Sequence, residues 1–296
     1  MKYIITGAAG NVSRPLAEKL LAAGHEVTVI GRNAEHLKPL TDKGAKAAIG
    51  SVDDVPFLKQ AFAGADAVYT MVPPQYAATD DLSGYQKVAA NYAEAIQANN
   101  IKYVVNLSSV GAHMPEGCGP VSGLYQLEQE LNKLSDANIL HLRPGFFFNN
   151  FYGNMEMIKG MNIIGGNYGD ANTKMVLSSP DDIADAAAEE LLNLSFKGHS
   201  VRYVPSDERT TGEVAKVLGA AVGKPELPWV EFTDEQAYGG MTQAGLPEGM
   251  AKKYMEMGSA LRNGKMQEDY WKNRPQQLGK TRLEDFAKNF AAAYNV

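Results

Sequence analysis

The sequence has very little cysteine and no segment typical of an exported protein. Cys118 is its single cysteine, so an intrachain disulfide is excluded. No catalytic-thiol motif surrounds Cys118, and we interpret it as a small buried or loop residue. From Met1 the chain runs directly into an apolar segment that ends at Thr6, without the apolar stretch and cleavage site of a signal peptide. We therefore expect a cytoplasmic protein whose folding does not depend on an oxidising compartment.

Long apolar runs, basic patches and metal-ligand patterns are absent as well. Nowhere do about 18 apolar residues follow one another without a charge, so no membrane-spanning helix is predicted. Lys and Arg number 28 against 34 Asp and Glu, and they are scattered, which argues against direct binding of nucleic acid. The five histidines have no partners at metal-ligand spacing, so no metal site is predicted. No Gly-x-Ser-x-Gly motif occurs, which argues against an esterase.

What the N-terminal half does contain is an alternation of short apolar runs with longer helical patterns. The predicted strands are Tyr3–Thr6, Glu26–Ile30, Ala45–Ile49, Ala67–Met71, Tyr103–Leu107 and Ile139–Leu142. The predicted helices are Val12–Ala23, Ala34–Lys43, Val55–Phe62, Leu82–Asn99 and Gly123–Leu134. Because crossovers between parallel strands are right-handed, this order predicts an α/β fold with a Rossmann-type, doubly wound parallel sheet. Ligands of such sheets bind at the carboxyl ends of the strands.

A glycine-containing turn joins the first predicted strand to the first predicted helix. In Thr6-Gly7-Ala8-Ala9-Gly10-Asn11-Val12-Ser13, Gly7 permits a tight turn and Gly10 lets the backbone approach a pyrophosphate. With Asn11 as its cap, the helix would present unpaired N–H groups and a favourable dipole to the phosphates. The sequence therefore predicts dinucleotide binding here, with an ordinary strand-to-helix turn as the alternative. The residues predicted to contact the phosphates are Gly7, Ala9, Gly10, Asn11 and Val12.

Further parts of the same site are predicted at the ends of the next strands. Where an NAD-specific site has a carboxylate after the second strand, this sequence has Gly31-Arg32-Asn33. Arg32 is placed to bind the 2′-phosphate of NADP(H) through charge-assisted hydrogen bonds and to stack on the adenine. The alternative is a solvated arginine at the start of a loop. The position of the later strand ends adds Val52, Asp53, Met71, Val72 and Pro73 to the predicted site.

Four short segments together carry a family resemblance. They are Thr6–Gly10, Gly31-Arg32, Asn106–Ala112 and Leu142–Asn150. With them, the chain resembles the NmrA-like branch of the atypical short-chain dehydrogenase/reductases over about its first 220 residues. NAD(P)H-binding quinone reductases and redox-sensing regulators belong to this branch. The resemblance implies a cofactor with its nicotinamide near Ser108, Pro144, Gly145 and Phe146, and a substrate pocket bordered by Asn149 and Asn150.

The resemblance comes with one departure that bears on catalysis. Typical short-chain reductases use a Tyr-x-x-x-Lys pair, in which the lysine lowers the pKa of the tyrosine so that it can supply a proton. Here Tyr125 is followed four residues later by Gln129, which carries no charge, and Lys133 lies roughly 12 Å along the helix. We interpret Tyr125 either as a proton donor or as a tyrosine that packs beside the nicotinamide.

The second half of the chain is less regular. A helix is predicted at Asp181–Leu194, a strand at Val201–Val204 and a capped helix at Thr211–Val222, followed by a Met-rich helical segment. We assign residues 1–150 to an NAD(P)-binding Rossmann domain that continues through parts of residues 176–222. Residues 151–175 and 223–296 are assigned to a smaller, mainly helical substrate-binding lobe.

Two functions of different classes fit these observations. The first is an NADPH-dependent reductase of quinones or other small conjugated carbonyl compounds, which reduces a flat substrate. The second is a catalytically idle NADP(H)-binding redox sensor. The residues predicted to border the substrate are His113, Phe147, Phe148, Asn149, Asn150 and Tyr152. Their aromatic rings either hold a flat substrate or pack in the core, and the sequence leaves a homodimer open.

Overall fold

A seven-stranded parallel sheet forms the centre of the N-terminal part in the computed structural model, which describes residues 1–74 and 82–295. Its strand order is β10-β6-β5-β4-β1-β2-β3. The strands are β1 (Lys2–Ile5), β2 (Glu26–Gly31), β3 (Lys46–Ile49), β4 (Ala67–Thr70), β5 (Tyr103–Leu107), β6 (Asn138–Pro144) and β10 (His199–Val204). Because the chain order reverses between β1 and β4, the carboxyl ends of these two strands flank the switch point of the sheet. The predicted fold class is confirmed.

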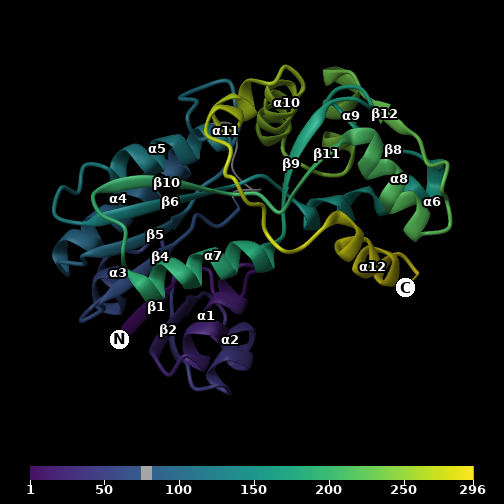
Figure 1. Cartoon of the computed structure of the whole chain (residues 1–296). Helices are drawn as coiled ribbons and strands as arrows, with labels where there is room; N and C mark the ends of the chain where they lie inside the picture. Colours follow the sequence, from purple (N-terminus) through teal and green to yellow (C-terminus); the bar gives the residue numbers. More distant parts are fainter. Residues whose placement is uncertain (75–81, 296) are drawn as a thin grey trace.

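Helices cover both faces of this sheet (Figure 1). One face carries α1 (Ser13–Ala22), α2 (Ala34–Thr41) and α7 (Pro180–Asn193), and the other carries α3 (Val55–Ala61), α4 (Ser83–Ala98) and α5 (Val121–Leu131). Each layer encloses its own apolar core against the sheet. Burial on both faces explains why the strands read as continuous apolar runs instead of alternating patterns. Tyr3, Ile4 and Ile5 of β1, for example, are all fully buried.

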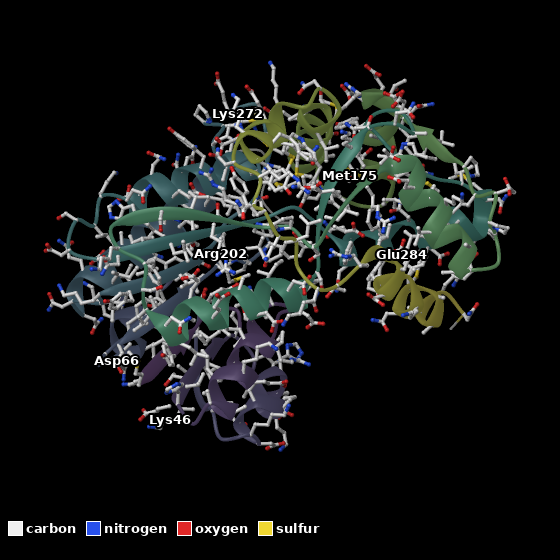
Figure 2. All side chains as sticks on the ribbon, viewed as in Figure 1. Lys46, Asp66, Met175, Arg202, Lys272 and Glu284 are labelled. Atoms are coloured by element: carbon white, nitrogen blue, oxygen red, sulfur yellow. The ribbon has the colours of Figure 1, made fainter. Side chains whose placement is uncertain are left out.

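A second packed region follows Pro144 and contains short strands as well as helices. A three-stranded sheet consists of β7 (Phe146–Phe147), β9 (Lys174–Ser178) and β11 (Asp207–Thr210), and a parallel pair consists of β8 (Ile164–Gly166) and β12 (Trp229–Glu231). The helical elements are η1 (Phe148–Asn154), α6 (Met155–Met161), α8 (Thr211–Ala221), α9 (Asp234–Gln243), α10 (Glu248–Arg262), η2 (Lys265–Gln267), α11 (Glu268–Lys272) and α12 (Leu283–Tyr294). Met175 lies inside this region, whereas Lys46 and Asp66 lie at the rim of the first region (Figure 2).

Two local predictions need correction. Asn11 is not the N-cap of α1, because Val12 occupies that position with helical backbone angles and makes no side-chain capping hydrogen bond. The segment from residue 223 onward is not entirely helical, because Trp229–Glu231 form β12 beside β8. By contrast, the capped helix predicted at Thr211–Val222 is present as α8, and Thr210 caps it in a capping box with Glu213.

Among the described residues, none of the helices combines the length and the apolar character that spanning a bilayer requires.

Candidate functional site

A cavity of about 680 Å³ lies at the carboxyl ends of β1, β2, β3 and β4. Its walls are the loops that follow these four strands and the first turn of α2. The lining residues are Gly7, Ala9, Gly10, Ile30, Gly31, Arg32, Asn33, His36, Leu37, Gly50, Ser51, Val52, Asp53, Met71, Pro73 and Pro74. The cavity therefore occupies the switch point of the sheet, where the topology places ligands.

The glycine turn after β1 shapes one wall of this cavity. Gly7 adopts a φ of +61°, which is strained for residues with a side chain, and the Gly10 N–H donates to the Gly7 carbonyl at 2.9 Å. A Cβ on Gly7 would lie 2.5 Å from Sδ of Met71, across the switch point on the β4 side. The backbone of the turn therefore borders the space between β1 and β4 directly. A side chain on Gly7 would fill part of that space.

The structure brings together about half of the residues that the sequence predicted for the cofactor. The eight that line the cavity are Gly7, Ala9, Gly10, Arg32, Val52, Asp53, Met71 and Pro73. Asn11 lies instead beside a smaller hollow between the first turns of α1 and the start of α7, together with Arg14 and Asp181. Val12 is buried in the core and Val72 packs half-buried against the core under α3 and α4.

Four predicted nicotinamide contacts lie further along the strand ends, outside the lining of the cavity. Ser108 directly follows β5, and Pro144 is the last residue of the adjacent strand β6. Gly145 donates its N–H to Ser178 Oγ at 2.8 Å. A Cβ on Gly145 would lie 2.2 Å from the Val176 carbonyl oxygen, so only glycine allows this close approach of two backbones. Phe146 belongs to β7, and its ring contacts Phe151 and Tyr168.

The two charged side chains at the end of the cavity near β2 and β3, Arg32 and Asp53, differ in their contacts. The Ser51 hydroxyl donates to the Asp53 carboxylate at 3.0 Å and accepts from the Asp53 N–H at 3.2 Å, so this carboxylate is held by its own loop. Arg32 is exposed and makes no ion pair with the residues that the structure describes. Arg32 is thus available to a ligand anion in the cavity.

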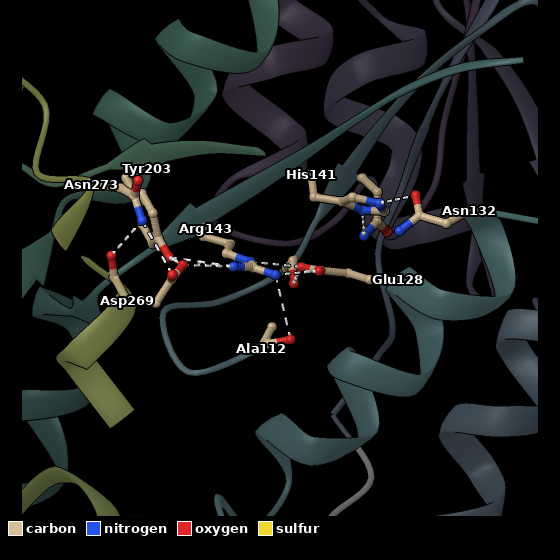
Figure 3. A network of polar contacts seen from close by, with 10 residues as sticks. Ala112, Glu128, Asn132, His141, Arg143, Tyr203, Asp269 and Asn273 are labelled. Carbon is tan, nitrogen blue, oxygen red and sulfur yellow. Dashed lines mark hydrogen bonds and ion pairs between the residues drawn. The ribbon is translucent and has the colours of Figure 1, made fainter. Parts of the chain in front are cut away.

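A buried ionic network joins Glu128 of α5, Arg143 of β6 and Asp269 of α11 (Figure 3). The Ser108 hydroxyl donates to Glu128 Oε1 at 2.5 Å, and Arg143 binds the same carboxylate in a bidentate manner, at 3.0 Å through Nε and 2.5 Å through Nη2. Glu128 is 2% exposed and the Arg143 side chain 9%. On its far side, Arg143 donates to Asp269 of α11 and to the Tyr203 hydroxyl. The network therefore connects the end of β5 to α11 of the second region.

Sequence reasoning missed this network, although a signal was present. Leu124, Leu127 and Leu131 are apolar positions of α5, and Glu128 falls between them at helical spacing. Arg143 similarly interrupts the apolar strand β6. A carboxylate and a guanidinium on two buried faces are expected to form an ion pair, because an unpaired buried charge has a large desolvation cost.

His141 of β6 is held in its neutral form by a second buried network. Its Nδ1 lies 3.1 Å from the amide nitrogen of Asn106, and its Nε2 lies 3.0 Å from the amide oxygen of Asn132. Asn106 in turn accepts from the Thr70 hydroxyl at 3.0 Å. Burial lowers the pKa of His141 from 6.5 to about 4.

The lowered pKa of His141 predicts an acid-sensitive fold. Between pH 6.5 and pH 4 the unfolded chain binds a proton at His141 and the folded chain does not, so stability falls as the pH falls through this range. We expect this group to contribute a loss of about 2–2.5 kcal/mol between pH 7 and pH 4.5, measured as the free energy of urea unfolding at pH 7, 5.5 and 4.5. A His141→Gln variant keeps a donor and an acceptor without titrating, and should show a correspondingly weaker pH dependence. An identical pH dependence in both proteins would contradict this assignment.

The single predicted catalytic residue, Tyr125, lies on α5, where the uncharged Gln129 stands four positions later. Tyr125 is half-buried, and its hydroxyl makes no hydrogen bond with the residues that the structure describes. Gln129 is exposed, and Lys133 pairs with Glu130 at the surface. Nothing in this arrangement activates the Tyr125 hydroxyl as an acid.

Several residues predicted to border the substrate belong to the core of the second region. Phe148 is 1% exposed and stacks on Phe286 of α12, and Tyr152 stacks on Phe290 of the same helix. These two rings therefore pack under α12, which is one of the two alternatives that the sequence left open. Phe147 is half-buried against the core beneath the sheet, Asn149 is half-buried and Asn150 is exposed.

His113 also faces the second region. Burial lowers its pKa, and the charges of Asp269, Arg143 and Glu268 act on it, which places its ring near α11. Its Nδ1 is buried without a hydrogen-bond partner among the described residues.

The residues around the cavity fit a dinucleotide cofactor. The glycine turn offers backbone that a side chain would obstruct, and α1 begins directly behind it. After β2, Arg32 offers a cation without an ion-pair partner among the described residues. The sequence anticipated these three features. It did not anticipate Asn33 and His36, which follow Arg32 at the start of α2, or Ser51, which lies near them because β3 pairs with β2.

Comparisons with known proteins agree with this geometry. A family model described as NAD(P)H-binding matches residues 7–193. The fold is similar to that of triphenylmethane reductase from Citrobacter sp., with 21% identity, a TM-score of 0.80 and coverage of 97% of this chain and 99% of that chain. It is also similar to an NADPH-dependent quinone oxidoreductase from Escherichia coli, with 19% identity, a TM-score of 0.81 and coverage of 99% and 100%.

One curated relative matches in sequence over a limited stretch. An uncharacterised protein of Schizosaccharomyces pombe is 34% identical over 98 residues, which are 33% of this chain and 32% of that protein. The match therefore spans about a third of the relative. The family model covers well over half of the chain, and the fold and the cavity agree with it. The chain belongs to the NAD(P)H-binding family, as its resemblance to NmrA-like proteins predicted.

Proposed function

We propose that this protein is an NADPH-dependent reductase of quinones or other small conjugated carbonyl compounds. The observation that carries the proposal is the cavity at the switch point, with the glycine turn on one wall and the unpaired Arg32 at its end. Bound NADPH supplies a hydride. Arg32 would hold the 2′-phosphate of the cofactor, which NADH lacks. The similar fold of the quinone and dye reductases supports the same class of reaction.

The way in which the oxygen of the reduced substrate would receive its proton favours a quinone as the substrate. Tyr125 has no cationic neighbour, and the proton of Ser108 is already donated to Glu128, so neither hydroxyl is prepared to protonate a substrate oxygen. A carbonyl that is reduced to an alcohol needs such a proton, because its alkoxide is strongly basic. A reduced quinone has more acidic hydroxyl groups and can take its protons from water. The chain is therefore better suited to quinones than to simple ketones.

The same missing proton donor also favours a second candidate, a catalytically idle sensor of the NADP(H) redox state. The two functions are separated by mixing purified protein with NADPH and a panel of quinones, while the nicotinamide absorbance at about 340 nm is followed. A reductase should consume NADPH with at least one quinone faster than the protein-free control. Tight NADPH binding without turnover of any acceptor would favour the sensor, and absence of NADPH binding would refute both.

A further inference from the structure

Among the described residues that line the cavity, Met71 is the only one that carries sulfur. It directly follows β4, and hydrogen bonds fix its backbone on both sides. Its N–H donates to Thr6 Oγ1 at 3.1 Å, and its carbonyl accepts from the Tyr92 hydroxyl at 2.7 Å. The main chain at Met71 is therefore tied to the end of β1 and to α4, and its half-buried side chain borders the cavity.

The sulfur of Met71 faces the glycine turn after β1. The position that a Cβ on Gly7 would take lies 2.5 Å from Met71 Sδ, 3.0 Å from Cγ and 3.3 Å from Cε, so the sulfur is the side-chain atom nearest to the turn. A diphosphate in the cavity would approach this same backbone. An atom added to the sulfur would therefore lie beside the space that the diphosphate needs.

A thioether sulfur at this position can be oxidised by hydrogen peroxide to a sulfoxide. The sulfur lone pair attacks one peroxide oxygen, the O–O bond breaks, and the second oxygen leaves as water. The sulfur is thus oxidised, the peroxide is reduced, and an apolar side chain becomes polar. The new oxygen accepts hydrogen bonds and carries partial negative charge, so it would repel an anionic diphosphate.

The single thiol of the chain is poorly suited to the same reaction. Cys118 is buried, and burial raises the pKa of its thiol to about 12. Because the thiolate is the form that reacts, Cys118 has little reactivity at neutral pH. Sulfur chemistry at the cavity therefore falls to Met71.

We propose that Met71 is an oxidation site through which peroxide controls cofactor binding. Met71 sulfoxide obstructs the glycine turn, and bound cofactor shields the sulfur. This inference rests on the proposed function, which supplies both the cofactor and the oxidant. A hydroquinone that reacts with dioxygen returns to the quinone and releases hydrogen peroxide. Accumulated peroxide would then stop further reduction by removing the cofactor.

The purified protein is treated with hydrogen peroxide, the peroxide is removed with catalase, and the dissociation constant of NADP⁺ is measured by calorimetry. Peptide mass spectrometry gives the fraction of each methionine that is oxidised. Oxidation of Met71 should weaken NADP⁺ binding at least about fivefold, as expected when a polar group in a binding site is left without a partner. Methionine sulfoxide reductase should restore the affinity, because it reduces the sulfoxide back to the thioether.

Two variants are the controls, and each is compared with its own untreated form, so a change in starting affinity does not enter. Met71→Leu has a similar volume and no sulfur, and peroxide should leave its NADP⁺ affinity unchanged. Met161 lies at the end of α6 and is 59% exposed. Met161→Leu should lose affinity on treatment as the unmodified protein does. Saturating NADP⁺ during treatment should slow the oxidation of Met71 and not that of Met161.

Three results would overturn the role of Met71. They are an equal loss of affinity in Met71→Leu and the unmodified protein, complete oxidation of Met71 with unchanged NADP⁺ binding, and oxidation of Met71 at the same rate with and without NADP⁺. The proposed function fails separately. If the untreated protein consumes NADPH with a quinone while peroxide leaves its NADP⁺ affinity unchanged, only the role of Met71 is refuted. If the untreated protein binds no nicotinamide nucleotide, both are refuted.

Discussion

Replacement of Glu128 by alanine is expected to lower the free energy of unfolding by about 3–5 kcal/mol. Arg143 would then keep a buried guanidinium without its bidentate carboxylate, and Ser108 would lose the acceptor for its hydroxyl. Asp269 contacts only the outer nitrogen of Arg143, at 3.2 Å, and cannot replace Glu128 from that side. Urea unfolding followed by circular dichroism measures the change.

A matched control lies two residues away on the same helix. Glu130 pairs with Lys133 at the surface, and the exposed fraction of the Lys133 side chain is 69%. Glu130→Ala should therefore cost less than about 1 kcal/mol, because exposed pairs gain little over solvation. If both alanine variants changed the unfolding free energy by the same amount, the buried network would not carry the stability that we assign to it. Should Glu128→Ala fail to fold, Glu128→Gln keeps the shape and one acceptor oxygen while it removes the negative charge, and it can be compared with Glu130→Gln in the same way.

Gly7→Ala is expected to weaken NADPH binding by at least about tenfold. The added methyl would lie 2.5 Å from Met71 Sδ in the space that a ligand needs, and the positive φ would cost about 1–2 kcal/mol for any L residue. Fluorescence titration with NADPH gives the affinity, and thermal unfolding gives the stability.

Gly24 provides the matched control for this glycine. It has a φ of +80° in the turn after α1, and a Cβ there would meet nothing within 4 Å. Gly24→Ala should therefore lose a similar amount of stability while NADPH affinity stays unchanged. An equal loss of affinity in both variants would mean that backbone strain, and not obstruction of the cavity, explains the effect of Gly7→Ala.

Much of the fold could be predicted because it depends on local patterns. The run Tyr3-Ile4-Ile5 predicts a strand buried on both faces, and Gly7 after it predicts the turn. The helix at residues 211–222 was predictable from Thr210 and Glu213, since a capping box is contained within four residues. The short strands β8 and β12 were not, because three residues carry no measurable periodicity.

The candidate site was predictable only where its residues follow strands in chain order. Arg32 could be located because it directly follows β2, and Gly7 because it follows β1. For the rings of Phe148 and Tyr152, which follow a strand end closely, the sequence left open whether they border a substrate or pack in the core. In the structure they pack on α12, more than 130 residues later, and sequence distance gives no indication of that contact.

The sequence alone determined the parallel α/β architecture, the glycine turn and the position of Arg32, because each follows from the chemistry of neighbouring residues. Only the tertiary structure decided which side chains meet. The pairing of Glu128 with Arg143 depends on how α5 packs against β6. The placement of Ser51 beside Arg32 in one cavity depends on the pairing of β2 with β3. The physical reason is that burial and close packing act between surfaces distant in the chain, and a linear pattern specifies that a surface is apolar or charged without specifying its partner.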